Sequence, residues 1–349
     1  MKSLCVGVDV SADELEVAYR ETGGTVARMR LGNTPKDHRA LVRELLKRSK
    51  SVRVVLESTG IYGLDLAMAL EQAKGIEVMV ANPRATANFG KALLQRSKTD
   101  SNDAETLLAF CERMPFVAWS RPSKAAFELR AISRRLYALN ELIRMEKNRE
   151  HAGAHLAAMP RSVDQSVKSV IAMLEREIER LRAAALKVIE SDELLHLRLT
   201  LLISVKGIGV VSAIGILGEL ALLPADMSPR QWVAHCGLDP RLFESGTSVR
   251  KQPRISKAGN KYLRAALYLP AVVAAQFDTH VIGFRTRLLH RGKMKKQVHV
   301  AVMRKLLHGI HGMFRHQQPW DGSKLFAAAD AVGAEEIASF AISSGSTAC

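Results

Sequence analysis

The sequence has few cysteines and no long apolar run, and each shortage excludes a class of protein. The four cysteines, Cys5, Cys111, Cys236 and Cys349, are scattered without a CxxC pair, which argues against a zinc site or a disulfide framework. No uncharged apolar stretch reaches the ~18–20 residues that a membrane span needs. Met1 leads straight into a strand-like segment without the pattern of a signal peptide. We therefore expect a reduced, cytoplasmic protein with no membrane partner.

Acidic residues are scarce in one part of the chain. Lys and Arg total 51 against 35 Asp and Glu, which gives a formal net charge of +16. From Arg241 to Arg315 there are 16 Lys or Arg residues and two acids, Glu244 and Asp278. Such an excess of positive charge on one region indicates a polyanionic partner, usually nucleic acid. Hydrophobic residues make up 47% of the chain, which is enough to build cores and excludes global disorder.

The first third of the chain contains four carboxylates in an informative pattern. Asp9 ends the apolar run LCVGVD, Glu57 ends VRVVLE, and Asp100 and Asp103 stand three apart in KTDSNDAETLL. Residues three apart share one face of a helix, with Cβ atoms about 5–6 Å apart. Carboxylates that converge repel one another unless a cation such as Mg²⁺ or Mn²⁺ joins them. The set predicts a metal site for phosphodiester chemistry; turn carboxylates and a solvated helix start are the alternative.

The order of predicted elements favours the same site. The periodicity predicts strands at 3–10, 15–21 and 25–31, a helix at 35–48, a strand at 52–56, a helix at 62–73, a strand at 76–81, and helices near 84–95 and 101–113. This order is typical of an α/β fold of the ribonuclease-H-like kind, in which the four acids meet at one sheet edge. We expect this metal domain over residues 1–118.

Residues 119–198 are predicted to form a coiled-coil or helical linker. Apolar residues alternate spacings of three and four from Leu129 to Ile143 and, after Met159 and Pro160, from Val167 to Val188. The two arms could fold back as an antiparallel hairpin or pair with another subunit, and a helical bundle inside one chain is the alternative. Either arrangement makes the segment a spacer or an assembly element.

Residues 199–318 are predicted to form a basic, all-α C-terminal domain, followed by a loosely ordered tail at 319–349. Lys206-Gly207-Ile208-Gly209 lies between two apolar helical stretches and resembles a helix-hairpin-helix turn. Glycines allow a tight bend and leave backbone N–H groups to hold a DNA phosphate. A packed helix–helix turn would explain the same residues.

A serine precedes a dense basic run. Ser245-Gly246 falls in a predicted loop, with Ser248 close by and Ser256 somewhat farther along. A loop serine among guanidinium groups is suited to a phosphoserine link to DNA, because the cations stabilise charge on the phosphodiester; a solvated Ser-Gly turn in a phosphate-binding loop is the alternative. The predicted nucleic-acid-binding residues are Lys206, Gly207, Gly209, Arg250, Lys251, Arg254, Lys257, Lys261, Arg264, Lys293, Lys295 and Lys296.

Two groups of motifs resemble the DEDD-type insertion-sequence transposases, the relatives of the Piv invertase described as bridge-RNA-guided recombinases. The first group is GVDVSADELEVA, LESTGIYG and KTDSNDAETL; the second is GIGVVSAIGILGEL, WVAHCGLDPRLFESG and ISKAGNKYLRAAL. The resemblance implies that the four acids bind divalent metal in a RuvC-like domain and that Ser245 attacks DNA and becomes linked to it. It also implies a guide RNA that pairs with donor and target DNA, and a homo-oligomer with sites shared between subunits.

We therefore expect a DNA transposase or recombinase that cuts and rejoins strands through a serine–DNA intermediate, assembled as a dimer or tetramer. The enzymatic alternative is a RuvC-like nuclease in which a metal-activated water attacks and Ser245 only binds phosphate. The non-enzymatic alternative is an architectural DNA- or RNA-binding protein with a degenerate metal site.

Overall fold

The chain forms two compact units, residues 1–121 and 122–349, each with its own core. The computed structural model describes residues 3–21, 23–57, 62–93, 100–156, 159–245 and 249–326. The first unit ends close to the domain boundary predicted at residue 118. The second unit joins the predicted helical linker and the predicted C-terminal domain in one body.

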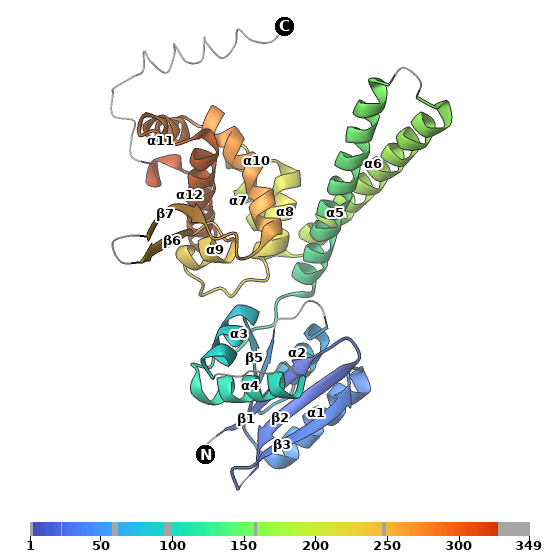
Figure 1. Ribbon diagram of the computed structural model, residues 1–349, viewed down its shortest axis with the longest axis vertical. Coiled ribbons are helices and arrows are strands. Elements are labelled where there is room, and N and C mark those ends of the chain that lie inside the picture. Colours follow the sequence, from blue (N-terminus) through green and yellow to red (C-terminus); the bar gives the residue numbers. More distant parts are fainter. Residues whose placement is uncertain are drawn as a thin grey trace. The chain divides into compact units, whose positions relative to one another are not determined.

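The N-terminal unit is a five-stranded mixed sheet with helices on both faces (Figure 1). Its strands are β1 (Leu4–Val10), β2 (Glu14–Arg20), β3 (Val26–Gly32), β4 (Val52–Glu57) and β5 (Ile76–Ala81). Its helices are α1 (Pro35–Arg48), α2 (Leu64–Glu71), α3 (Pro83–Ala92) and α4 (Asp100–Arg113). The strand order is β3-β2-β1-β4-β5, with β1 antiparallel to β2 and parallel to β4. This topology supports the predicted ribonuclease-H-like fold.

Polar caps and prolines set the start of two helices in this unit. The Thr34 side chain accepts a hydrogen bond from the backbone N–H of Asp37, and Pro35 takes the first position of α1, where no N–H is needed. Asn82 and Pro83 start α3 in the same way. These signals are local, so α1 begins at the residue that the sequence predicts.

Successive side chains of β1 and β4 point to opposite faces of the sheet, and this divides the core of the N-terminal unit into two layers. Val6 and Val8 of β1 pack with Leu56 of β4 and with α1 and α2 on one face of the sheet. Val55 packs with Leu107 and other residues of α4 on the opposite face. Because successive side chains of a strand point to opposite faces, residues 5, 7 and 9 of β1 and residue 57 of β4 face α4.

The described part of the C-terminal unit is helical except for one two-stranded hairpin. Its helices are α5 (Lys124–Ala154), α6 (Arg161–Glu190), α7 (Glu193–Ile203), α8 (Val210–Leu220), α9 (Pro229–His235), α10 (Lys261–Phe277), α11 (Thr279–His290), α12 (Lys295–His316) and the short 3₁₀ helix Gly322–Lys324. The hairpin strands are β6 (Pro240–Ser245) and β7 (Val249–Ile255). No single described helix is long and apolar enough to cross a membrane; α10 and α11 meet that criterion only together, as a pair bent by 93°.

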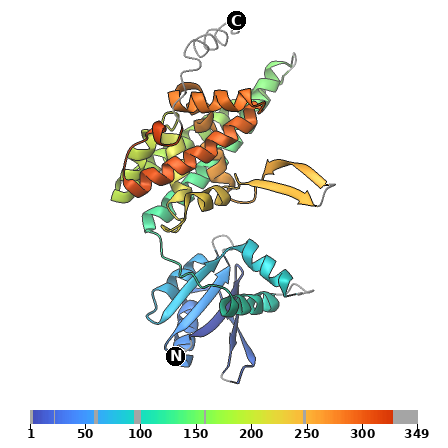
Figure 2. The same ribbon diagram turned by 90° about the vertical axis from the view of Figure 1, so that its left-hand side faces the viewer.

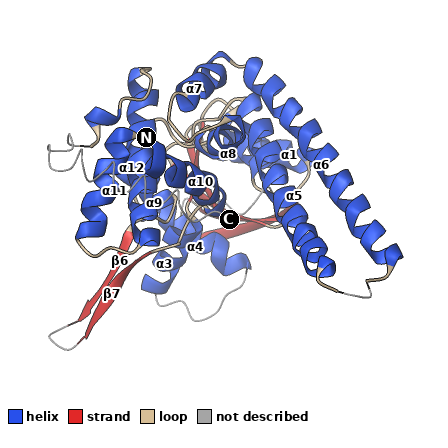
Figure 3. Ribbon diagram, turned by 90° about the horizontal axis from the view of Figure 1, so that it is seen from above, coloured by secondary structure: helices blue, strands red, loops and turns tan. Residues whose placement is uncertain are grey.

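The long helices α5 and α6 lie side by side as an antiparallel pair (Figures 1 and 3). The apolar residues Leu136 and Leu139 of α5 and Leu174 and Ile178 of α6 are less than a tenth exposed. The predicted seam is therefore buried within one chain, which realises the hairpin arrangement that the spacing left open. Coiled-coil geometry and a role in assembly stay predictions.

The glycine turn between α7 and α8 packs closely against α10. Gly207 has a φ of +101°, and a Cβ at this position would lie 2.8 Å from the carbonyl oxygen of Pro270. Gly209 is the N-cap of α8, and Lys206 is exposed. Helix packing thus accounts for Gly207, and the helix-hairpin-helix motif stays a prediction.

Two features of the C-terminal unit differ from the predictions. The region expected to be all-α contains the β6–β7 hairpin, which extends away from the helices (Figure 2), and Ser245 is the last residue of β6. Residues 246–248 lie outside the described residues. The sequence predicts a loosely ordered tail from residue 319, but the first residues of this tail pack against the helices. Phe326 is 1% exposed, and Trp320 Nε1 donates to Asp278 at 3.0 Å. The tail beyond residue 326 is outside the described part of the chain.

Candidate active site

Asp9 and Glu57 lie next to each other at the ends of the two central parallel strands. Val8 of β1 is paired with Leu56 of β4, so the residues that follow, Asp9 and Glu57, are level with each other. Neighbouring strands are about 4.8 Å apart, and both side chains are on the face that α4 covers. Both residues are partly exposed. Two of the four predicted acids therefore share one edge of the sheet.

Helix α4 lies directly on β1 because Gly7 has no side chain. A Cβ on Gly7 would lie 2.2 Å from the carbonyl oxygen of Ala104 and 2.3 Å from the amide nitrogen of Leu108. Farther along α4, the Cys111 thiol donates to the carbonyl oxygen of Arg53 near the start of β4, at 3.4 Å. Helix α4 therefore runs opposite to β1 and β4, and its first turn lies toward the strand ends that carry the two acids.

The other two predicted acids belong to this first turn. Asp103 is partly exposed and immediately precedes Ala104, whose carbonyl oxygen adjoins Gly7. Asp100 is the first residue of α4, and its side chain lies outside the described set. The positive end of a helix stabilises a carboxylate by about 0.3–1 kcal/mol. The backbone thus directs all four positions to the same end of the sheet.

Thr86 of α3 orients Glu57. The hydroxyl of the buried Thr86 lies 3.2 Å from Glu57 Oε1 and 3.0 Å from the carbonyl oxygen of Pro83, so Glu57 shares the one hydroxyl proton with the first turn of α3. Sequence reasoning missed both Thr86 and Gly7. A glycine inside an apolar strand signals close approach of another backbone, so Gly7 was detectable. Thr86 was not, because its contact with Glu57 joins residues 29 positions apart.

Salt bridges and apolar packing hold α4 on the sheet. Arg20 donates to both carboxylate oxygens of Glu112, at 2.8 and 3.1 Å, and Arg28 pairs with Glu105. Exposed ion pairs contribute only about 0–1 kcal/mol each. Burial of one leucine side chain contributes about 1.5–3 kcal/mol, so the buried face of α4 dominates its attachment.

Thiol chemistry does not contribute to this site. A hydrogen bond with Cys5, together with burial, raises the pKa of the Cys111 thiol. Because the thiolate is the reactive form, a thiol with a raised pKa is a poor nucleophile at neutral pH. Cys5 and Cys111 also lie beside Arg53, near the start of β4 and away from the acids, so the carboxylates are the candidate reactive groups at the acidic edge of the sheet.

The donor chemistry of the four acids suits Mg²⁺ or Mn²⁺, which are hard cations that prefer oxygen ligands. Within the side chains that the structure describes, no three His, Cys, Asp or Glu groups lie together as a ready metal site. Asp100 is not among those side chains. The set therefore fits a divalent cation by ligand type and by backbone placement.

The predicted nucleic-acid-binding residues fall into three places of the C-terminal unit. The exposed ones are Lys206 in the α7–α8 turn, Arg254, Lys257 and Lys261 near the base of the hairpin, and Lys293, Lys295 and Lys296 at the start of α12. Arg250 and Lys251 belong to β7, and their side chains lie outside the described set. Arg264 instead donates to the carbonyl oxygen of Cys236 at 2.8 Å, so it holds the backbone of its own unit.

A buried carboxylate holds the base of the hairpin to the helices. Glu219 of α8 is 3% exposed and accepts hydrogen bonds from Arg134 of α5, at 2.7 and 3.0 Å, and from Asn260, at 2.6 Å. Asn260 also caps α10. Burial lowers the pKa of the neighbouring His235, so this histidine is neutral at pH 7. Sequence reasoning missed this network because its partners are 41 and 85 positions apart.

Comparison with known proteins gives the class of enzyme. A DEDD-type IS110 model described as "Transposase" matches residues 6–159, and a model described as "Transposase IS116/IS110/IS902 family" matches residues 199–284. The protein is therefore a transposase, an enzyme that cleaves and rejoins DNA. The two models follow one another along the chain and together span more than half of it, so the chain contains both domains of a DEDD transposase of the IS110 type.

Two relatives are the pilin gene-inverting proteins of Moraxella lacunata and Moraxella bovis. Each is 28% identical to this chain over 277 residues, which span 78% of this chain and 83% of the relative. The solved structure of T. thermophilus RuvC in complex with Holliday junction substrate matches with 15% identity and a TM-score of 0.24, over 32% of this chain and 96% of that chain. The fold assignment rests on the strand order.

The match to DEDD transposase domains corrects the expected chemistry. The prediction of a covalent serine–DNA intermediate at Ser245 is wrong, because the matching family assigns catalysis to a metal-dependent acidic site. Such a site activates water or a strand hydroxyl and needs no protein nucleophile. The metal-dependent alternative fits better, and the enzyme uses a divalent ion such as Mg²⁺ or Mn²⁺. The Ser245 side chain lies outside the described residues.

Proposed function

We propose that this transposase cuts and joins DNA strands at an acidic, metal-dependent site in its N-terminal unit and holds the DNA with its basic C-terminal unit. One observation carries the proposal. Asp9 and Glu57 end neighbouring parallel strands, directly below the helix whose first turn contains Asp100 and Asp103. Acids from three separate elements that the backbone directs to one sheet edge suit a shared hard cation with oxygen ligands.

The four acids and Thr86 have different roles at this site. Asp9, Glu57, Asp100 and Asp103 would hold the cation, and the Thr86 hydroxyl, which lies 3.2 Å from Glu57 Oε1, helps to position that carboxylate. A bound Mg²⁺ or Mn²⁺ would act as a Lewis acid on the scissile phosphate and would lower the pKa of an attacking water. Without a cation, the carboxylates repel a phosphodiester, so the same residues make productive DNA binding depend on the metal.

Cutting and joining can use one chemistry. In cutting, water attacks phosphorus and the bond to the 3′-oxygen breaks, which leaves a 3′-hydroxyl and a 5′-phosphate. In joining, a 3′-hydroxyl takes the place of water, so one phosphodiester forms as another breaks. The number of phosphodiester bonds is conserved in the joining step, which therefore needs no ATP and no covalent link to the protein.

The test is strand cleavage and joining by the full chain on DNA that carries the ends of the insertion sequence. Both activities should require Mg²⁺ or Mn²⁺ and should stop when EDTA is added. Glu57→Gln should abolish both, because it removes one metal ligand and little packing. Glu71→Gln is the matched control, since Glu71 is an exposed glutamate at the end of α2 with the same charge. Full activity of the Glu57 variant would overturn the proposal.

We also propose that the protein works as a homo-oligomer. The α5–α6 pair leaves large apolar side chains exposed, including Leu142 (44%), Met145 (45%), Val163 (46%) and Met173 (53%). Leu142 and Met145 stand three apart and so share one face of α5, and exposed apolar side chains on one helix face support contact with a second copy. Sedimentation should give a dimer or tetramer, and Leu142→Lys with Met145→Lys should lower its mass; a monomeric parent would contradict this.

A guide RNA is the further partner that we propose. The family resemblance and the net charge of +16 support it, because a strongly basic surface binds RNA as well as DNA. Sequencing of RNA that co-purifies with the protein should recover one structured species encoded beside the gene. Recovery of random fragments alone would contradict a dedicated guide.

A further inference from the structure

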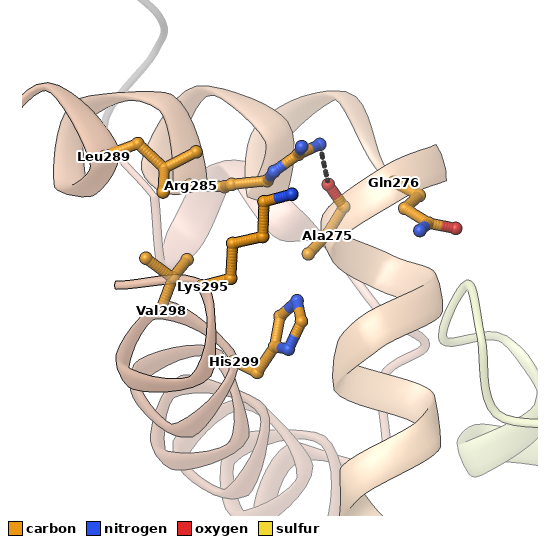
Figure 4. A pocket seen from close by; sticks show the side chains of 7 residues that line it. All are labelled: Ala275, Gln276, Arg285, Leu289, Lys295, Val298 and His299. Carbon is orange, nitrogen blue, oxygen red and sulfur yellow. Dashed lines mark hydrogen bonds between the residues drawn. The ribbon is translucent and has the colours of Figure 1, made fainter. Parts of the chain in front are cut away.

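A small cavity between α10, α11 and α12 is lined by three basic side chains. Its volume is about 130 Å³, and its lining is Ala275, Gln276, Arg285, Leu289, Lys295, Val298 and His299. One water needs only about 10–15 Å³ of such space, so the cavity has room for a tetrahedral oxyanion. Figure 4 shows the Arg285 and Lys295 side chains converging on one side of the cavity, with the His299 ring facing the same space. The three groups come from two helices.

Carboxylates are absent from the lining. Among the residues that the structure describes, none places a carboxylate within 4 Å of Arg285 or Lys295. The nearest acid in sequence, Asp278, is 7% exposed and fully engaged: its carboxylate accepts from the backbone N–H groups of His280 and Val281 and from Trp320 Nε1. Two cations that converge without an acid repel each other, which an anion would relieve.

The basic groups keep donors free for a ligand. Arg285 donates one N–H to the carbonyl oxygen of Ala275 at 3.3 Å, and a guanidinium has five N–H donors. The Nδ1 atom of His299 is buried and has no hydrogen-bond partner among the described groups. Buried polar atoms are nearly always paired, so the His299 ring has a hydrogen-bonding position that no described group fills.

Helix α12 adds to the positive potential. Lys295 is its first residue, and its first turn contains no acid. The N-terminal end of a helix carries a partial positive charge that favours anions. Burial lowers the pKa of His299, and the positive charges of Arg285 and Lys295 lower it further. The histidine therefore lies in the positive potential of these two side chains.

We propose that this cavity holds one phosphodiester group of the nucleic-acid backbone between Arg285, Lys295 and His299. The proposal rests on the proposed DNA binding of the C-terminal unit and identifies a built site within that basic surface. The guanidinium and the ammonium contact phosphate oxygens, and the ring of His299 donates one N–H to a third oxygen. The contact is independent of sequence, because it reaches only the backbone.

A salt titration of DNA binding by the full chain tests this site. Arg285→Gln with Lys295→Gln should lower the slope of log Kobs against log salt by about 0.9, because one phosphate is no longer neutralised. Arg287→Gln with Arg291→Gln is the matched control, because it removes the same charge from α11 and its C-cap without touching the cavity. Circular dichroism and thermal melting establish that each variant is folded.

The outcomes separate the cavity from the wider basic surface. An equal change of slope in both double variants, or no change in the cavity variant, overturns the cavity site while DNA binding stands. A parent chain that does not bind DNA overturns both proposals.

A second measurement follows the ring of His299, with His299→Gln used to assign its nitrogen resonances. A short DNA duplex should shift the ring nitrogen resonances of His299 in the parent and leave them unchanged in Lys295→Gln. Inorganic phosphate at the same phosphorus concentration is the comparison. If free phosphate shifts the resonance as much as DNA does, the cavity takes free phosphate and a role in holding the backbone is wrong.

Discussion

The two units of this chain treat charge in opposite ways. Residues 1–121 carry a net charge of +3, and residues 122–349 carry +13. In the N-terminal unit, arginines such as Arg20 and Arg53 pair with glutamates, and four acids are directed to one sheet edge. In the C-terminal unit, the buried acids Glu219 and Asp278 serve internal bonds, and exposed cations remain for a polyanion. Cutting and holding DNA are thus assigned to separate units.

The largest expected effect comes from Gly7→Ala, which disturbs only the acidic unit. Its Cβ would lie 2.2 Å from the Ala104 carbonyl oxygen, so α4 has to move away from β1. The free energy of unfolding of this unit should fall by about 3 kcal/mol or more, at the upper end for overpacking. Strand cleavage should be lost while DNA binding remains.

Gly23→Ala is the control for this prediction, because a Cβ at Gly23 would meet nothing within 4 Å. Urea unfolding and cleavage assays check both variants. A Gly7→Ala enzyme that cuts DNA at the parental rate would show that α4 does not depend on this close approach.

Glu219→Gln should destabilise the basic unit instead. It leaves Arg134 without its charged partner, and removal of one partner from a buried pair costs about 3–5 kcal/mol. Because Arg134 is 35% exposed, we expect a smaller effect, with the free energy of unfolding falling by roughly 2–3 kcal/mol. Glu177→Gln, which breaks an exposed pair with Arg180 on α6, should change the free energy of unfolding by less than about 0.5 kcal/mol. Equal urea midpoints for the two variants would contradict the network.

Thr86→Val tests how the acidic site is held in place. Loss of the hydrogen bond to Glu57 should lower the cleavage rate about tenfold, which corresponds to roughly 1.4 kcal/mol of barrier. The free energy of unfolding should change by no more than about 1.5 kcal/mol. Single-turnover cleavage measures the rate, with Thr200→Val on α7 as the control. A rate unchanged by Thr86→Val would mean that Glu57 is oriented by other groups.

The smallest expected effect is on pH dependence, and it concerns both units. Burial lowers the pKa of His38 in the N-terminal unit and of His235 in the C-terminal unit. Below pH about 6.5, the unfolded chain takes up protons that the folded chain does not, so the free energy of unfolding falls as the pH decreases. Each histidine contributes at most about 1.4 kcal/mol per pH unit.

Urea midpoints at pH 7.5 and 5.5 check this dependence. His235→Gln should flatten the dependence for the C-terminal unit, and His290→Gln, at an exposed position, should not. A midpoint that rises as the pH falls would reverse the sign and contradict the assignment.

The acidic unit was predictable because its site depends on backbone topology. Strand period and element order place Asp9 and Glu57 on one face and at one edge, whatever the surrounding side chains are. The basic unit was less predictable. Its hairpin strands, PRLFES and VRKQPRI, lack an apolar alternation, so strand periodicity could not predict them. Contacts such as Glu219 with Asn260 depend on how distant helices pack.

The serine prediction failed for a chemical reason. Local composition around Ser245 shows cations that suit a phosphate, and such cations serve binding as well as catalysis. Sequence reasoning therefore located a basic region and assigned it the wrong task. The same ambiguity does not arise for four converging acids, which repel phosphate unless a metal is present.

The central claim is that one unit cuts and the other holds, and single-turnover kinetics test it most directly. Asp103→Asn and the double variant Lys257→Gln with Lys261→Gln are compared with the parent for DNA affinity and for cleavage rate at saturating DNA. We predict that Asp103→Asn keeps the affinity and loses the rate, and that the lysine variant loses affinity and keeps the rate. Cleavage at the parental rate by Asp103→Asn would contradict the claim.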